Sequence, residues 1–375
     1  MVDCIHCRIE KQGDQYKLVW TKNPMHIPKS IEYSYVITEN AASIQLQADD
    51  LLNKLNQYSN TPTPGKLKDL ATEGYMVYRM LIPQNDDQKQ TKIVDCMLNK
   101  LGIGTKLKIT EGVTDGIQLP WNCIYEEDPQ NSTEVLPDHF WGFKYSLSVL
   151  PESMGEISNQ EQLPIPPSKI LCGIDKQFYD KWKNIGQVLQ KLHCGCTSCK
   201  IPDCGNTIPG GNQLVAAINA TPPNILFLFC HASKSETNAW PRLSLNCLEV
   251  DTKQLKRLLV WEKYKDVKPL VFFMGCFSGQ TNNITSIGFK EIFCGRGWRG
   301  MIAVDAKVRP EFAERFVKDF FSEFIKCEKQ VGEIIYDLRW QYYNDSKERL
   351  KKPWQGYEGL LFSLYCPLEL KAGLV

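Results

Sequence analysis

Two continuous apolar runs stand out in the pattern of hydrophobic and polar positions along the chain. One covers residues 224–230 (Asn-Ile-Leu-Phe-Leu-Phe-Cys) and is followed by His231; the other covers residues 269–275 (Pro-Leu-Val-Phe-Phe-Met-Gly) and is followed by Cys276. Short apolar runs bounded by turn residues are typical of strands covered on both faces, although periodicity alone also fits a buried helical segment. Each run therefore predicts a buried strand with a chemically versatile side chain at its end.

The segment between these runs predicts a helix. Residues 251–264 carry apolar side chains at roughly helical spacing, and Asp251 stands at the expected N-cap. Strand, helix and strand make a βαβ unit, and ligands of open α/β sheets bind at the carboxyl ends of the strands. His231 and Cys276 are therefore expected at the same edge of one sheet.

The rest of the chain predicts a mixed α/β protein in two parts. Strands are expected at 4–10, 16–21, 31–38, 106–110, 116–125, 140–150, 169–173, 300–304 and 358–365, and helices at 41–58, 67–81, 178–192, 211–220, 288–294, 311–327 and 331–343. The prolines of segment 163–167 resist both helix and central strand. This segment divides the chain into an N-terminal half, residues 1–162, and a C-terminal half, residues 168–375.

Composition narrows the class of protein. The chain has 375 residues, is 43% hydrophobic and carries a formal net charge of +1 without a long run of like charge, which argues against direct nucleic-acid binding. No stretch approaches eighteen consecutive apolar residues, and the first residues lack the pattern of a signal peptide, so we expect no membrane span and a cytoplasmic location. Fifteen cysteines in such a chain favour free thiols, metal ligands or a nucleophile over a disulfide framework.

The cysteine and histidine at the two strand ends predict nucleophilic catalysis. A thiol with a pKa of about 8.5 is mostly protonated at neutral pH, and a neighbouring histidine is the usual base that activates it. The backbone amides near Ala232 and Cys276 are our candidate donors to the oxyanion. The alternative is structural, because buried cysteines and packed histidines are common; of the five histidines, however, only His231 ends an apolar strand.

These motifs resemble CHAT-domain peptidases, a caspase-like group in the clan of cysteine peptidases that also contains caspases, separases and gingipains. The resemblance extends over roughly residues 40–370 and is carried by Phe-Leu-Phe-Cys-His at 227–231, Val-Phe-Phe-Met-Gly-Cys-Phe-Ser-Gly at 271–279, Gly-Trp-Arg-Gly-Met-Ile-Ala-Val at 297–304 with the helix that follows, Leu-Pro-Trp at 119–121, and the segment 359–365. It implies a caspase-like α/β fold with a mostly parallel sheet flanked by helices, His231 and Cys276 as the dyad, no catalytic cofactor, and a degenerate caspase-like N-terminal half.

The resemblance also bears on specificity. The family usually has glycines after the histidine, whereas this chain has Ala232-Ser233-Lys234, a less adaptable loop. In the substrate pocket, Lys307 or Arg309 would favour an acidic substrate residue, whereas Asp305 would favour a basic one. The third interpretation is that all three are solvated charges of a loop outside the pocket. Trp240, in a loop close to His231, is a candidate wall of the same pocket.

A second cysteine cluster predicts a structural zinc site. Cys194, Cys196, Cys199 and Cys204 lie within eleven residues that also contain glycine and proline, which is the ligand type and spacing of closed tetrahedral zinc sites. Free thiols in a surface loop and a redox-labile disulfide are the alternatives.

Together these features predict a cytoplasmic cysteine endopeptidase that cleaves a specific protein partner. Family resemblance adds activation by a protein partner and a role in prokaryotic antiviral defence or signalling. A catalytically silent caspase-like interaction module is the main alternative. A zinc-centred nucleic-acid adaptor is a third, opposed by the neutral charge balance.

Overall fold

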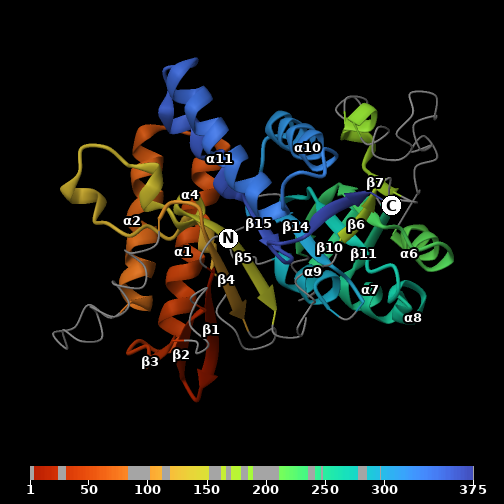
Figure 1. Cartoon of the computed structure of the whole chain (residues 1–375), viewed down its shortest axis with the longest axis horizontal. Helices are drawn as coiled ribbons and strands as arrows, with labels where there is room; N and C mark the ends of the chain where they lie inside the picture. The colour runs from red at the N-terminus through yellow and green to blue at the C-terminus, as the bar shows by residue number, and fades with distance from the viewer. Residues whose placement is uncertain are drawn as a thin grey trace. The chain divides into compact units, whose positions relative to one another are not determined.

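The computed structural model describes residues 4–23, 31–82, 102–111, 119–151, 162–165, 170–178, 185–188, 211–234, 241–245, 248–277, 285–295 and 297–374. The chain forms two compact units. The first comprises Met1–Glu152 and Arg339–Ser363, and the second comprises Ser153–Leu338 and Leu364–Val375. The division falls inside helix α11 (Val331–Glu348) and strand β15 (Phe362–Tyr365). The fold is mixed α/β, as the sequence predicts (Figure 1).

The first unit contains a five-stranded sheet in the order β3-β2-β1-β4-β5. Its strands are β1 (Cys4–Gln12), β2 (Gln15–Asn23), β3 (Ile31–Val36), β4 (Thr105–Glu111) and β5 (Tyr145–Pro151). The first three pair antiparallel, whereas β4 pairs in parallel with both β1 and β5. Alternate residues of β1 are buried, because successive side chains of a strand point to opposite faces.

Two long helices, α1 (Ala41–Asn60) and α2 (Pro64–Leu81), pack against each other in this unit. Asn40 caps α1 through a hydrogen bond from the Ser43 amide, and Thr63 caps α2 in the same way from Lys66. Pro64 is the first residue of α2, where its missing N–H costs nothing. The helix therefore begins three residues earlier than the expected 67–81. Short helical turns complete the unit: η1 (Trp121–Cys123), η2 (Pro129–Asn131), η3 (Pro137–His139), α4 (Trp141–Lys144) and η6 (Pro353–Leu361).

The second unit is built on a five-stranded sheet in the order β15-β14-β12-β8-β7. Besides β15, it contains β7 (Ile170–Ile174), β8 (Ile225–Phe229), β12 (Leu270–Phe273) and β14 (Gly300–Val304). The pairs β7–β8, β8–β12 and β12–β14 are all parallel, and every residue of β8, β12 and β14 is buried. The two apolar runs thus form adjacent parallel strands, as expected.

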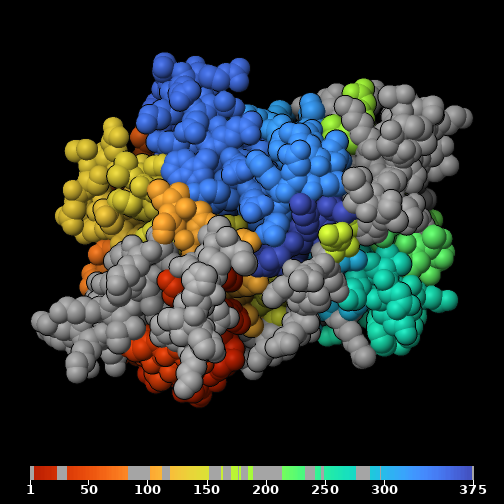
Figure 2. Space-filling model, viewed as in Figure 1, coloured from red at the N-terminus to blue at the C-terminus, as the bar shows by residue number. Residues whose placement is uncertain are grey.

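Helices cover both faces of this parallel sheet. Phe272 of β12 contacts Phe320 and Phe321 of α10 (Pro310–Phe324), at ring-centroid distances of 4.9 and 4.5 Å. The next residue, Phe273, contacts Phe289 of α9 (Thr285–Phe293) at 4.8 Å. Since neighbouring residues of a strand point to opposite faces, α9 and α10 lie on opposite sides of the sheet. The outer side of α10 is at the molecular surface (Figure 2).

The connection between β8 and β12 is longer than a simple βαβ crossover. It contains β9 (His231–Lys234), β10 (Pro241–Leu245) and β11 (Leu248–Asp251), followed by the short helices α7 (Thr252–Leu258) and α8 (Trp261–Tyr264). The expected cap is present, because Asp251 and Gln254 form a reciprocal capping box at the start of α7. The expected single helix over 251–264 is, however, broken into two, preceded by strands that the sequence did not reveal.

The remaining elements of the second unit are α6 (Gly211–Ala220), η5 (Lys176–Phe178) and a two-stranded parallel sheet of β6 (Gln162–Ile165) and β16 (Lys371–Leu374). The proline-rich segment proposed as a boundary thus contributes an edge strand. Of the helix expected over 178–192, residues 185–188 are helical and the others beyond Phe178 lie outside the described residues. Among the described helices, none combines the length and apolarity that a membrane span requires.

Three of the predicted strands are partly helical. Of the strand expected at 116–125, residues 121–123 form η1 and residues 116–118 lie outside the described residues. Residues 141–144 form α4 before β5 begins, and the expected strand at 358–365 is a 3-10 helix until Leu361. A buried arginine binds all three of these helical turns. Arg339, 1% exposed, donates from Nη1 to the Gly142 carbonyl (2.8 Å), from Nε to the Gly359 carbonyl (3.2 Å), and from Nη2 to the Phe362 carbonyl (2.7 Å) and Asn122 Oδ1 (2.9 Å). Carbonyls that turn toward one guanidinium cannot all join a sheet ladder.

Replacing this arginine should weaken the first unit. Arg339→Met leaves several buried acceptors without a donor, and one such group costs about 1–3 kcal/mol. We expect the free energy of unfolding to fall by at least about 3 kcal/mol, measured by urea denaturation followed by circular dichroism. Arg349→Met is the control, since that side chain is 78% exposed and its nearest carboxylate oxygen, on Asp345, is 4.0 Å away. Equal unfolding midpoints in the two variants would contradict the role given to Arg339.

Candidate functional site

The candidate site lies where β8 and β12 end. Beyond β8, the buried residue Cys230 leads into β9, and beyond β12, Met274 and Gly275 lead into β13 (Cys276–Phe277). The Met274 amide still donates to the Leu228 carbonyl at 2.8 Å, so the main ladder persists up to the break. Both segments of the chain then enter a second sheet, which has the strand order β11-β10-β9-β13.

Backbone pairing places Cys276 directly opposite His231. Strands β9 and β13 are parallel, with Cys276 in register with His231 and Phe277 with Ala232. Before the break, Leu270 is in register with Ile225, so both partner pairs are separated by 45 residues of sequence. The register is therefore conserved across the break. Neighbouring strands lie about 4.8 Å apart, a spacing at which adjacent side chains can interact.

Glycine at position 275 allows this close arrangement. A Cβ atom at Gly275 would lie 3.2 Å from the Phe273 ring and 3.3 Å from the Ala232 Cβ, both tighter than ordinary contacts. The backbone between β12 and β13 can thus approach β9. Ala232, a predicted oxyanion donor, is buried in the middle strand β9 between Leu243 of β10 and Phe277 of β13. Ser278 and Gly279, which continue the predicted turn, lie outside the described residues.

The imidazole of His231 is half-buried and contacts the turn η5 after β7. The Phe178 ring lies 5.2 Å from the His231 ring and stacks on Phe229 at 4.5 Å. The Nε2 atoms of Gln177 and His231 form a hydrogen-bond contact. Sequence reasoning missed both residues because it treated Phe178 as the start of a helix. One signal was available: the chain after β7 emerges at the same edge of the parallel sheet as His231.

The predicted pocket residues follow β14, at the same end of the parallel sheet. Asp305 is half-buried, and its Oδ1 accepts a hydrogen bond of 2.7 Å from the Tyr365 hydroxyl. The Lys290 ammonium lies 4.7 Å from the centre of the Tyr365 ring. Lys307 and Arg309 are exposed. Trp240 lies outside the described residues, so its predicted place beside the pocket stays a prediction.

The predicted zinc ligands Cys194, Cys196, Cys199 and Cys204 also lie outside the described residues. Within the described ranges, no group of three or more His, Cys, Asp or Glu side chains could hold a metal ion.

Near the N-terminus, burial beside Lys108 and Arg8 lowers the pKa of His6, whose Nε2 lies 2.7 Å from the Thr110 hydroxyl.

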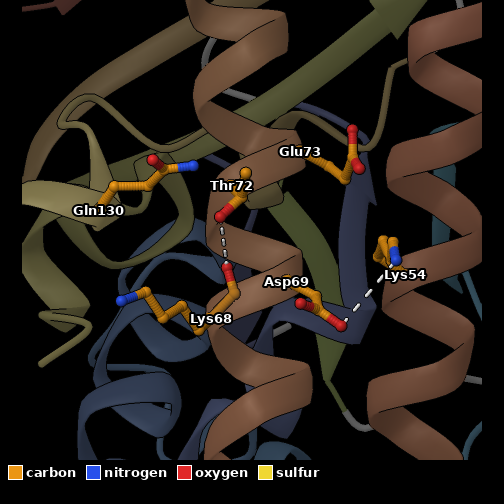
Figure 3. A pocket seen from close by; sticks show the side chains of 6 residues that line it. All are labelled: Lys54, Lys68, Asp69, Thr72, Glu73 and Gln130. Atoms are coloured by element: carbon orange, nitrogen blue, oxygen red, sulfur yellow. Dashed lines mark hydrogen bonds and ion pairs between the residues drawn. The ribbon is translucent and has the colours of Figure 1, made fainter.

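A separate hollow of about 460 Å³ lies in the first unit, between α1, α2 and η2 (Figure 3). Its lining residues are polar or charged: Lys54, Lys68, Asp69, Thr72, Glu73 and Gln130. Lys54 and Asp69 form an ion pair at 3.9 Å, and the Thr72 hydroxyl donates to the Lys68 carbonyl at 2.9 Å. Two basic and two acidic side chains give this hollow no net charge, and it contains none of the predicted catalytic residues.

Several other thiols are fully buried, and burial shifts their pKa. Burial raises the pKa of Cys294 to about 12 and raises the pKa of Cys7 and Cys366 well above its usual range. These thiols remain protonated at neutral pH, and the thiolate is the nucleophilic form. A reactive cysteine in the folded protein should therefore stand out against them.

A scan against protein-family models finds no match for this chain, and a search of curated proteins finds none either.

The pKa of Cys294 predicts a loss of stability in alkali. Above pH 9.0, the thiol ionises in the unfolded chain but keeps its proton in the folded protein until about pH 12. Unfolding is then favoured by about 1.4 kcal/mol per pH unit for this one group. We expect the slope of unfolding free energy against pH, between pH 10 and 11, to be shallower by about that amount in Cys294→Ala. Between pH 6 and 8 the unaltered protein and Cys294→Ala should have the same slope. Equal slopes of the two proteins in alkali would contradict the prediction.

Proposed function

We propose that the chain is a caspase-like cysteine endopeptidase in which His231 activates Cys276. The parallel register that sets Cys276 opposite His231 is the observation that carries this proposal. A cysteine nucleophile needs a base close by, and a histidine one strand away meets that need. The positions at the carboxyl ends of parallel strands agree with where α/β proteins bind their ligands.

The chemistry that follows is acyl transfer in two steps. The Cys276 thiol passes its proton to His231 while sulfur attacks the scissile carbonyl carbon, and the carbonyl oxygen becomes an oxyanion. Collapse of this intermediate breaks the C–N bond, and the imidazolium returns the proton to the leaving amine. Water, deprotonated by His231, then hydrolyses the thioester and restores the thiol. The amides of Ala232 and Cys276 are our candidates for the oxyanion donors.

The substrate in this proposal is a protein with a defined residue before the scissile bond. Asp305 is our first candidate for selecting a basic residue, because its hydrogen bond to Tyr365 fixes its position. Lys307 and Arg309 would select an acidic residue instead. Activation by a protein partner, and a role in defence or signalling, rest on the family resemblance alone.

Selective alkylation tests the dyad. The native protein is treated at neutral pH with iodoacetamide and with two peptide chloromethyl ketones, one ending in arginine and one in aspartate, and the modified residues are mapped by mass spectrometry. We expect fast labelling at Cys276, abolished in Cys276→Ala and at least about a hundredfold slower in His231→Ala, the usual scale of general base catalysis. Faster reaction with the arginine probe would support Asp305.

Slow labelling at Cys276, no different in His231→Ala, would contradict the dyad. That result would favour the catalytically silent interaction module, a function for which Ala232-Ser233-Lys234, in place of glycines, is the supporting feature. Buried Cys294 and Cys366 provide the internal reference, because their protonated thiols should stay unlabelled in the folded protein.

We also propose a structural zinc ion held by Cys194, Cys196, Cys199 and Cys204, on the evidence of their spacing alone. Four thiolate ligands leave no open position, so the metal would stabilise a loop without joining the reaction. We expect about one zinc per chain by elemental analysis of the purified protein, and its loss in the double variant Cys196→Ser, Cys199→Ser. Absence of zinc from the unaltered protein would contradict this site.

A further inference from the structure

The turn η5 supplies a residue whose role the dyad alone does not explain. Gln177 is exposed, yet its amide Nε2 is in hydrogen-bond contact with Nε2 of His231. The two residues are 54 positions apart in sequence. An imidazole that serves as a base needs one nitrogen free and the other held, because the held nitrogen fixes both the ring orientation and the tautomer.

The backbone of Gln177 is firmly anchored to the strand that leads into His231. The Asp175 amide donates to the Phe229 carbonyl at 2.9 Å, continuing the β7–β8 ladder. Asp175 then closes the turn: its Oδ1 accepts from the Gln177 amide at 3.1 Å, and its carbonyl accepts from the Phe178 amide at 2.9 Å. The buried Phe178 ring, stacked on Phe229, fixes the other side of Gln177.

Sheet order places the segments that carry Gln177 and Cys276 on opposite sides of the strand that leads into His231. Strand β8, which precedes His231, lies between β12 and β7. Cys276 follows β12, whereas Gln177 follows β7. The glutamine and the cysteine therefore come from opposite sides of His231. With Nε2 contacted from the β7 side, Nδ1 is the nitrogen left for the β12 side.

We propose that Gln177 is a positioning residue that holds Nε2 of His231 and reserves Nδ1 for the Cys276 thiol. This inference rests on the proposed dyad and adds a third member to it. Nδ1 can take the thiol proton only in the tautomer that carries the ring hydrogen on Nε2, so that hydrogen needs an acceptor both before and after the transfer. A glutamine amide has both a donor and an acceptor, and a half-turn about its last torsion presents Oε1 to that hydrogen.

Charged groups on the neighbouring elements are few among the described side chains. Asp175 lies in the turn itself, and its Oδ1 already accepts from the Gln177 amide. Arg242 of β10 is paired with Glu249 of β11 at 2.7 Å. The neutral amide of Gln177 is the group whose contact with the imidazole is direct, and it is the one to vary.

Two substitutions at Gln177 separate the effect of its hydrogen bond from the effect of its side-chain size. Gln177→Leu keeps the size but removes the hydrogen bond, and we expect Cys276 alkylation to become about tenfold slower, the effect of one hydrogen bond to a group that becomes charged. Gln177→Glu keeps an acceptor and adds a charge that stabilises the imidazolium. A stabilised imidazolium gives up its proton at higher pH, so the acid limb of the rate against pH should move to higher pH. Gln187→Leu, an exposed glutamine of the same unit, should leave rate and profile unchanged.

Nitrogen NMR of histidine-labelled protein tests the contact independently of Cys276 reactivity. The His231 signals are assigned by their loss in His231→Ala, and we expect the Nε2 signal to move in Gln177→Leu but not in Gln187→Leu. An unmoved Nε2 signal overturns the inference, as does an unchanged alkylation rate in Gln177→Leu when Cys276 reacts in a His231-dependent way. A moved signal with an unreactive Cys276 supports the contact and contradicts the peptidase proposal instead.

Discussion

The parallel pairing of β8 with β12 is the constraint on which the candidate site depends. Both strands are fully buried, and Phe272 and Phe273 anchor β12 to helices on opposite faces of the sheet. A strand held on both faces cannot slip by one residue without exchanging its two sets of side chains. The register is therefore fixed before the break, and it carries over to His231 and Cys276 beyond it.

The first unit contains, beside its apolar core, a buried polar network centred on Arg339. Arg339 donates to the carbonyls of Gly142 in α4 and Phe362 at the start of β15, and to Asn122 Oδ1. Asn122 in turn donates from Nδ2 to Ser363 Oγ at 2.7 Å. A buried guanidinium is stable only where enough acceptors surround it, so this network requires defined backbone conformations in each segment that it touches. Those conformations are helical turns, where local patterns favour strands.

The functional proposal rests on chemistry and backbone geometry, since no family model matches the chain. Cys276 and His231 lie on neighbouring parallel strands, and Gln177 contacts Nε2 of His231; in the proposal each of the three groups has a distinct task. The proposed nucleophile, base and positioning group follow three adjacent strands, β12, β8 and β7. One edge of the sheet thus carries all three positions.

The sequence by itself determined the buried strands, the capped helices and the pairing of His231 with Cys276 at one sheet edge. These features depend on local signals: continuous apolar runs, the Asp251 cap, and the rule that consecutive parallel strands end together. Only the tertiary structure decided the strands inserted between β8 and β12, the helical turns bound by Arg339, and the contact of Gln177 with His231. The physical reason is sequence distance, because Gln177 and His231 are 54 positions apart and Arg339 and Asn122 are 217 apart. Contacts over such distances leave no periodic signal in the chain.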